Sequence, residues 1–162
     1  YYYITVMNEN YAHPAMPAGA EQGILKGMHR LRAAGKGKKI VRLLGAGAIL
    51  REALAAAQVL EDEHGVAAEV WSVTSFTELR RDGRAAKKSW VAQCLEGGKG
   101  PVIAASDYVS ALADLIREWV PGKYVTLGTD GFGRSDTRAA LRAHFGVDRD
   151  AIVRAALGAL GA

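Results

Sequence analysis

One glycine-rich segment, residues 128–136, brings together residue types that could do chemistry at a single place. It reads Gly-Thr-Asp-Gly-Phe-Gly-Arg-Ser-Asp and contains two acids, an arginine and one aromatic side chain. As an enzyme site, this loop would supply carboxylates for acid and base catalysis and a helix start that binds an anion. As an interface, it would supply an aromatic anchor with charged neighbours. The residues alone leave both interpretations open for Asp130, Phe132, Arg134, Ser135 and Asp136.

Partners for a nucleophilic or metal-dependent site are not gathered in the sequence. Only His144 lies near the 128–136 loop, and the four histidines stand at no ligand spacing from one another or from a cysteine. Cys94 has apolar neighbours and no activating partner close to it, which favours a buried structural thiol. We therefore assign no catalytic, cofactor-binding or metal-binding residue to this chain.

Three other loops also follow predicted strands. Residues 45–48 contain two glycines of a dinucleotide-binding pattern, but Leu50 replaces the third, so a tight turn is favoured. Helix capping explains the polar residues of 73–76 and 105–108, although Asp107, at a strand end, could also serve an interface.

Composition indicates a single soluble domain. About half of the 162 residues are hydrophobic, only four are proline, and no apolar run is long enough to span a membrane. The single cysteine fits a reducing compartment, so we expect a cytoplasmic protein. The basic clusters at 36–42 and 80–88 lack the interleaved aromatics of a nucleic-acid binder. They are best explained as solvated loops, and the second could also dock an acidic partner.

Apolar runs without alternation predict strands that are buried on both faces of a sheet. They lie at 1–6, 39–44, 66–73, 101–105 and 124–127. Helical patterns separate them, and this alternation predicts an α/β fold, a three-layer α/β/α domain with a mostly parallel sheet.

Apolar residues at helical spacing predict the helices, and capping residues predict their ends. The first helix begins at residue 21 and ends at the glycines of 35–37, with an apolar face of Ile24, Leu25, Met28 and Leu31. Ser106 and Asp107 are predicted to cap a helix with an apolar face of Tyr108, Leu112, Leu115, Ile116 and Trp119. Four more helices are predicted, of which one runs from residue 50 to Gly65 and another from Ser75 to Gly83. A third follows the cap Ser135-Asp136 and ends at Gly146, and the last follows the cap Asp148. Residues 89–95 are ambiguous.

The chain opens on Tyr1 without an initiator methionine or a targeting signal, although its first residues resemble the middle of a strand. We therefore expect a piece of a larger protein. Residues 1–18 would be the end of a preceding domain and a linker, and residues 19–162 would form the domain itself.

Four stretches resemble the first, decarboxylating component of homodimeric pyruvate dehydrogenase complexes. They are Tyr-Tyr-Tyr-Ile-Thr-Val-Met-Asn-Glu-Asn-Tyr at 1–11, Leu-Leu-Gly-Ala-Gly-Ala-Ile-Leu-Arg-Glu at 43–52, Val-Trp-Ser-Val-Thr-Ser-Phe-Thr-Glu-Leu at 70–79 and Leu-Gly-Thr-Asp-Gly-Phe-Gly-Arg-Ser-Asp-Thr-Arg at 127–138. They span nearly the whole chain in the right order. The resemblance implies a C-terminal domain similar to that of transketolase.

The resemblance also implies a function for the parent protein. Enzymes of this family bind thiamine diphosphate and magnesium in their first two domains, decarboxylate pyruvate and pass the acetyl group to a lipoyl group of the dihydrolipoyl acyltransferase component. This fragment would hold none of the cofactor and would be inactive alone. Its partners would be the other domains of the parent chain, a homodimer partner and the acyltransferase, without nucleic acid or membrane. The implied role of Asp130, Phe132, Arg134, Ser135 and Asp136 is then a domain or subunit interface.

Two alternatives remain open. One is a stand-alone docking or regulatory module with this fold and without catalysis. The other is a different enzyme of the superfamily, such as transketolase or a related 2-oxoacid dehydrogenase. The sequence also departs from the family, whose members carry a longer segment, rich in aromatic and charged residues, where only residues 84–89 connect Gly83 to Trp90 here.

Overall fold

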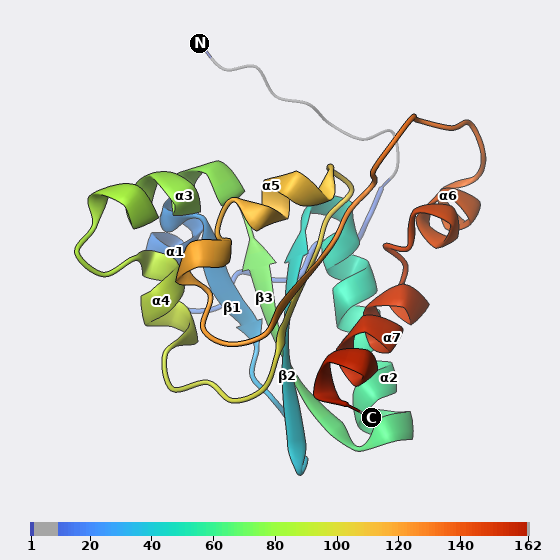
Figure 1. The fold of residues 1–162 in the computed structure, drawn as a ribbon, viewed down its shortest axis with the longest axis horizontal. Helices are drawn as coiled ribbons and strands as arrows, with labels where there is room; N and C mark the ends of the chain where they lie inside the picture. The colour runs from blue at the N-terminus through green and yellow to red at the C-terminus, as the bar shows by residue number, and fades with distance from the viewer. Residues whose placement is uncertain (2–9, 162) are drawn as a thin grey trace.

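The structure is a computed structural model that describes Tyr1 and residues 10–161 (Figure 1). Apart from Tyr1, the strand predicted at 1–6 lies outside the described residues. The sheet has five strands: β1 Met28–Arg32, β2 Lys39–Ala46, β3 Val66–Val73, β4 Val102–Ala105 and β5 Tyr124–Leu127. The α-helices are α1 Glu21–Lys26, α2 Leu50–His64, α3 Phe76–Ala85, α4 Trp90–Leu95, α5 Ser110–Asp114, α6 Arg138–Phe145 and α7 Arg149–Leu160. Two 3-10 turns, η1 Gly47–Ile49 and η2 Arg117–Trp119, complete the elements.

The strand order is β1-β3-β2-β4-β5, and the predicted mostly parallel sheet is confirmed. β2 pairs in parallel with β3 and β4, and β4 pairs in parallel with β5, whereas β1 is antiparallel to β3. From β2 the chain first moves outward to β3 on one side and later to β4 on the other. The order of the strands therefore switches direction between β2 and β4, where ligands of such sheets often bind.

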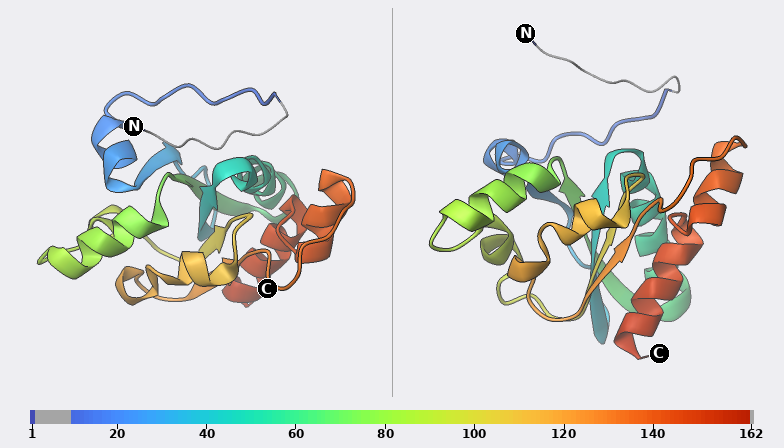
Figure 2. Two further views of the ribbon diagram at one scale, coloured as in Figure 1. Left: turned by 90° about the horizontal axis from the view of Figure 1, so that it is seen from above. Right: turned by 45° about the horizontal axis from the view of Figure 1, so that its top comes forward.

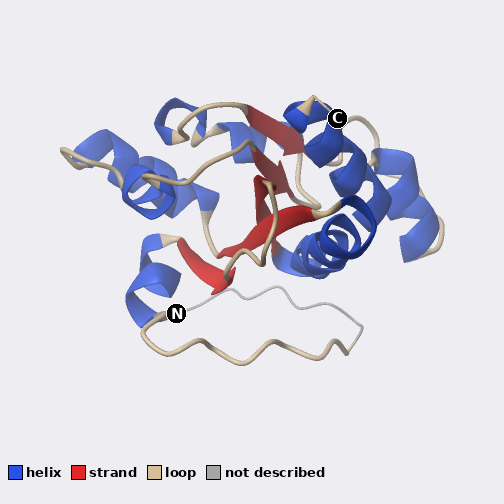
Figure 3. Cartoon of the chain, turned by 90° about the horizontal axis from the view of Figure 1, so that it is seen from below, coloured by secondary structure: helices blue, strands red, loops and turns tan. Residues whose placement is uncertain are grey.

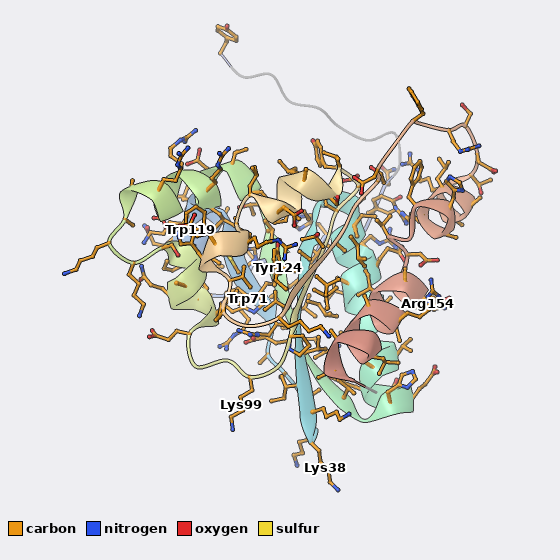
Figure 4. All side chains as sticks on the ribbon, viewed as in Figure 1. Lys38, Trp71, Lys99, Trp119, Tyr124 and Arg154 are labelled. Atoms are coloured by element: carbon orange, nitrogen blue, oxygen red, sulfur yellow. The ribbon has the colours of Figure 1, made fainter. Side chains whose placement is uncertain are left out.

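Helices cover both faces of the sheet, which confirms the three-layer architecture (Figures 2 and 3). Successive strand residues point to opposite faces. Leu43 and Val70 therefore pack beneath α2 and α7, whereas Leu44 and Trp71 pack beneath α3, α4 and α5. Trp71 lies inside the second core (Figure 4). No helix in the described part of the chain is long and apolar enough to cross a membrane.

Several predicted helix ends are confirmed by their hydrogen bonds. The Ser75 hydroxyl accepts from the Glu78 amide at 3.1 Å, and the Asp148 carboxylate accepts from the Ala151 amide at 2.8 Å. Gly65 ends α2 in the left-handed region, with φ of 61°. The cap of α6 was predicted wrongly. Thr137, rather than Ser135-Asp136, accepts the capping bond, from Ala140 at 3.3 Å. The ambiguous segment 89–95 contains α4, whose first turn is capped by Ser89.

The predicted helix from residue 21 to the glycines of 35–37 is wrong in its second half. α1 ends at Lys26 because Gly27 takes φ of 105°, which favours glycine. The carbonyl of Gly27 accepts hydrogen bonds from the amides of Thr74 and Ser75, at 2.8 and 3.1 Å. The chain then forms β1, whose first residue Met28 pairs with Val73. This distant strand pairing overrides the local helical spacing.

The predicted helix after Ser106 and Asp107 is also shorter than expected. α5 starts only at Ser110. The residue at its cap position is Val109, whose side chain forms no capping hydrogen bond. Ser106 is buried, and its hydroxyl accepts from the Tyr108 amide at 3.1 Å within a turn. Hydrogen bonds to the chain after β5 hold residues 106–109 outside the helix, so Tyr108 does not lie on its apolar face.

Candidate interaction site at the carboxyl ends of the strands

The four parallel strands end at one edge of the sheet, the upper edge in Figure 1. The loops that follow them are residues 47–49, 74–75, 106–109 and 128–137. The loops after the four parallel strands therefore meet at this edge. Some of their polar groups form hydrogen bonds within the chain, and others are exposed to a binding partner.

The loop after β2 is the tight turn that was predicted. A Cβ atom on Gly45 would lie 2.7 Å from the Cα atom of Leu50, so glycine lets the helix begin close against the strand. Gly47 has φ of 55°, in the left-handed region. These glycines have a structural role.

The loop after β3 anchors α1. The Thr74 hydroxyl donates to the Ile24 carbonyl at 2.8 Å, and the Ser75 hydroxyl caps α3. These polar groups are thus occupied within the fold.

The loops after β4 and β5 are fastened together. The Thr129 amide donates to the Tyr108 carbonyl at 2.9 Å, and the Thr129 hydroxyl donates to the Asp107 carbonyl at 2.6 Å. The Ser110 amide donates to the Asp130 carboxylate at 2.9 Å. Asp130 therefore acts within the chain by fixing the start of α5 against the 128–137 loop.

This joined pair of loops carries three exposed apolar side chains, which we name the strand-end surface. Phe132 is 96% exposed, Tyr108 is 61% exposed and Val109 is 49% exposed. Aromatic side chains are frequent anchors of protein interfaces. Sequence reasoning identified Phe132 but missed Tyr108 and Val109, because Tyr108 was assigned to a buried helix face. Their position directly after a predicted strand could have indicated that they lie in an exposed loop.

The remaining predicted residues, Arg134, Ser135 and Asp136, are exposed on the 128–137 loop. The Asp136 carboxylate accepts from the Thr137 amide at 2.6 Å. These three residues and His144 line one pocket, yet no hydrogen bond links Ser135 to His144 among the described residues. The hydroxyl is therefore without the base that an activated nucleophile needs.

Helix α6 is held to the domain through Glu52 of α2. Its carboxylate accepts from Arg142 at 2.9 Å and from the backbone amide of Arg149, at the start of α7, also at 2.9 Å. Both Glu52 and Arg142 are mostly buried. Because no residue of α6 is itself buried, this pair is important for the position of the helix.

The N-terminal segment reaches the same edge of the sheet. The guanidinium of Arg51 lies 4.1 Å from the ring centre of Tyr11, a cation–π contact. Residues 11–14 line a cavity of about 530 Å³ together with Gly47, Ala48 and Leu54. Figure 2 shows the segment that starts at residue 10 passing over this end of the sheet toward α1.

Neither a reactive thiol nor a metal centre is found in the described part of the chain. Burial raises the pKa of Cys94 to about 12, so the thiol stays protonated at neutral pH. Among the described residues, no group of three or more His, Cys, Asp or Glu side chains could hold a metal ion. The described residues therefore offer no ligand set for magnesium.

Comparison with known proteins assigns this architecture to a family. The family model of the transketolase-like TK C-terminal domain matches residues 27–148. The pyruvate dehydrogenase E1 component of Pseudomonas aeruginosa is 55% identical to this chain over 174 residues, covering 99% of the chain and 20% of the relative. The E1 component of Escherichia coli is 47% identical over 173 residues, covering 99% of the chain and 19% of the relative.

Solved transketolase structures share the fold. Transketolase from Leishmania mexicana superposes with a TM-score of 0.62 at 19% identity, over 86% of this chain and 19% of its own. A split-gene transketolase, described as an inactive β4 tetramer, gives 0.61 at 23% identity, over 83% of this chain and 42% of its own.

The relatives are much longer than the 162-residue sequence. The chain spans about a fifth of the length of the curated relatives it matches. The alignment with the P. aeruginosa protein has 174 positions for 162 residues, so that relative carries residues without a counterpart here. The chain belongs to the family of transketolase-like C-terminal domains and is similar, along almost its whole length, to part of the pyruvate dehydrogenase E1 components.

Proposed function

We propose that this chain is the C-terminal lobe of a pyruvate dehydrogenase E1 component. The parent enzyme would oxidatively decarboxylate pyruvate and transfer the acetyl group to the lipoyl group of the dihydrolipoyl acyltransferase. The observation that carries this proposal is the similarity to E1 components along almost the whole chain. Residues 19–162 would form the lobe, and residues 1–18 would be the linker and the end of the preceding domain.

The role of the lobe within the enzyme is assembly. The strand-end surface of Tyr108, Val109 and Phe132 presents large apolar side chains that a partner would cover. The segment from residue 10 passes over the same edge of the sheet and lies against the loop after β2. Asp130, Arg134, Ser135 and Asp136 would form the polar rim around Phe132. The partner is the remainder of the E1 homodimer, either from the same subunit or from the other.

The cofactors belong to the other domains under this proposal. Thiamine diphosphate, bound with magnesium, supplies the carbanion chemistry of the reaction. The described residues of this lobe offer no ligand set for the metal, which supports its placement elsewhere. The proposed compartment is the cytoplasm, in keeping with a single unpaired cysteine.

A chimeric enzyme tests the proposal. The corresponding C-terminal part of the P. aeruginosa E1 component is replaced by this chain, and a truncated enzyme without that part serves as the reference. We expect the chimera to form dimers and to decarboxylate pyruvate, and the truncated enzyme to lose both properties. A chimera as inactive as the truncated enzyme would contradict the proposal. A truncated enzyme of full activity would favour the stand-alone docking module instead.

A pair of substitutions in the chimera tests the strand-end surface. Phe132→Asp places a charge on the proposed anchor and should weaken association at least tenfold. Leu25→Asp is the matched control, because Leu25 is also strongly exposed but lies on α1. Analytical ultracentrifugation measures the dimer dissociation constant of both variants. Equal constants for the two variants would exclude Phe132 from the interface.

The isolated chain provides a third test. When thiamine diphosphate and magnesium are titrated into it, calorimetry should detect no saturable heat. Saturable binding would place part of the cofactor site in this lobe and overturn the proposed division of roles.

A further inference from the structure

A cavity of about 400 Å³ opens between the carboxyl ends of β2 and β4, where the order of the strands switches direction. Segments far apart in the sequence converge on it. Its wall includes Ala48 of η1, Asp107 after β4 and Thr129 after β5, and α6 closes the far side. In sheets of this type, the crevice at the switch point is the usual place for a ligand. The position alone therefore marks it as a candidate binding site.

The charges around the cavity are unequal. Arg134, Arg138 and Arg142 line it at intervals of four residues, against the single carboxylate of Asp107. Arg142 is paired with Glu52. In contrast, within the described residues neither the Arg134 guanidinium nor the Asp107 carboxylate has a hydrogen bond or an ion pair. Arg138 also has an interaction of its own. Arg134 is therefore the lining arginine that is left to bind an anion.

The floor of the cavity is apolar. Ile49, Leu141, Phe145 and Val147 contribute to its lining, and Val147 and Ile49 are also buried in the core. Binding pockets for small molecules combine such an apolar lining with a few polar groups that fix orientation. A guanidinium suits a carboxylate or a phosphate, since it presents parallel N–H donors to two oxygens. Asp107 suits a hydroxyl or an amine.

We propose that this cavity binds a small organic anion, a carboxylate or phosphate monoester with an apolar body. The anionic group meets Arg134, and the apolar body rests on the floor formed by Ile49 and Phe145. Asp107 accepts a hydrogen bond from a hydroxyl or amino group on the ligand. This site lies beyond the assembly role proposed above and is tested on the 162-residue chain, so either proposal can fail without the other.

The test uses nuclear magnetic resonance of the labelled chain with phenyl phosphate and with benzoate. Benzyl alcohol, which lacks the anion, is the reference ligand. We expect saturable shifts of the amides of Ala48, Ile49 and Thr129 with at least one anion and much weaker shifts with benzyl alcohol. Comparison of the two anions distinguishes a phosphate site from a carboxylate site. Shifts confined to other parts of the chain, or none that saturate, would overturn the proposal.

Two arginine substitutions make the test specific. Arg134→Ala should raise the dissociation constant about tenfold or more, because it removes a charge-assisted hydrogen bond. Arg154→Ala removes the same charge from an exposed position on α7 that does not line the cavity (Figure 4), and should leave the constant unchanged. Both residues are exposed, so both variants should fold. Equal weakening by the two substitutions would indicate unspecific attraction and refute the site.

Discussion

Replacing Gly128 by alanine should force apart the two loops that carry the strand-end surface. The added Cβ would lie 2.3 Å from the amide nitrogen of Ser110 and 2.6 Å from its Cα atom. Both are backbone atoms at the start of α5, so no side-chain rotation can relieve the contact. The backbone of one loop must move instead.

The structure gives the size of the effect. Crowding in a packed region costs about 1–3 kcal/mol. The movement also strains three bonds between the loops, which are Thr129 amide to Tyr108 carbonyl, Thr129 hydroxyl to Asp107 carbonyl, and Ser110 amide to Asp130 carboxylate. Each such bond contributes about 0.5–1.5 kcal/mol net. Loss of one bond together with the crowding lowers the free energy of unfolding by about 3 kcal/mol, which lowers Tm by roughly 6–12 °C in a chain of this size.

Urea denaturation of the isolated chain measures this loss, and hydrogen exchange at the Ser110 amide reports whether the loops separate. Gly133→Ala is the matched control from the same loop, because its added Cβ would meet no atom within 4 Å. It should change the free energy of unfolding by less than about 0.5 kcal/mol. If Gly128→Ala were as stable as Gly133→Ala and protected Ser110 equally well, the reasoning about the joined loops would be refuted.

Two further predictions concern other parts of the domain. Glu52→Gln should lower the free energy of unfolding by about 1–3 kcal/mol, since it leaves Arg142 without its carboxylate partner; a denaturation midpoint equal to that of the unchanged chain would contradict this. Cys94 should react slowly with iodoacetamide at pH 8 and quickly once urea unfolds the chain, since burial raises its pKa from 9.0 to about 12. Because the folded pKa is the higher one, its contribution to stability is present below pH 9 and is lost as pH rises toward 12, and Cys94→Ala should lessen that decline. Equal alkylation rates in the folded and unfolded chain would show that the thiol is not protected.

Only the tertiary structure decided which segment forms the antiparallel edge strand. Ile24, Met28 and Leu31 have the spacing of a helix face, and the local pattern cannot reveal a pairing partner more than forty residues away. Pairing of Met28 with Val73 outweighs the helical preference, and Gly27 makes the change of direction possible. The signal in the sequence was Gly27 itself, an unfavourable residue inside a helix.

Some residues of the candidate site could likewise be predicted from the sequence, and others could not. Phe132 could be recognised from the sequence, because an aromatic residue among glycines and charges has no periodic neighbours to bury it. Tyr108 could not, because its exposure depends on Thr129 holding the 106–109 loop away from α5. The cavity beside Arg134 could not be predicted from the sequence either, since it is built from loops that meet only when β2, β4 and β5 lie side by side.

The sequence by itself determined the class of fold and most of its elements. Continuous apolar runs require burial on both faces of a sheet, and Ser75, Asp148 and Gly65 specify helix ends through bonds or dihedral angles within a few residues. These signals are local, so a sequence displays them directly. The edge strand, the joined loops and the lining of the cavity depend instead on contacts between distant residues. The tertiary structure alone decided them, because the energy of those contacts exists only once the sheet has formed.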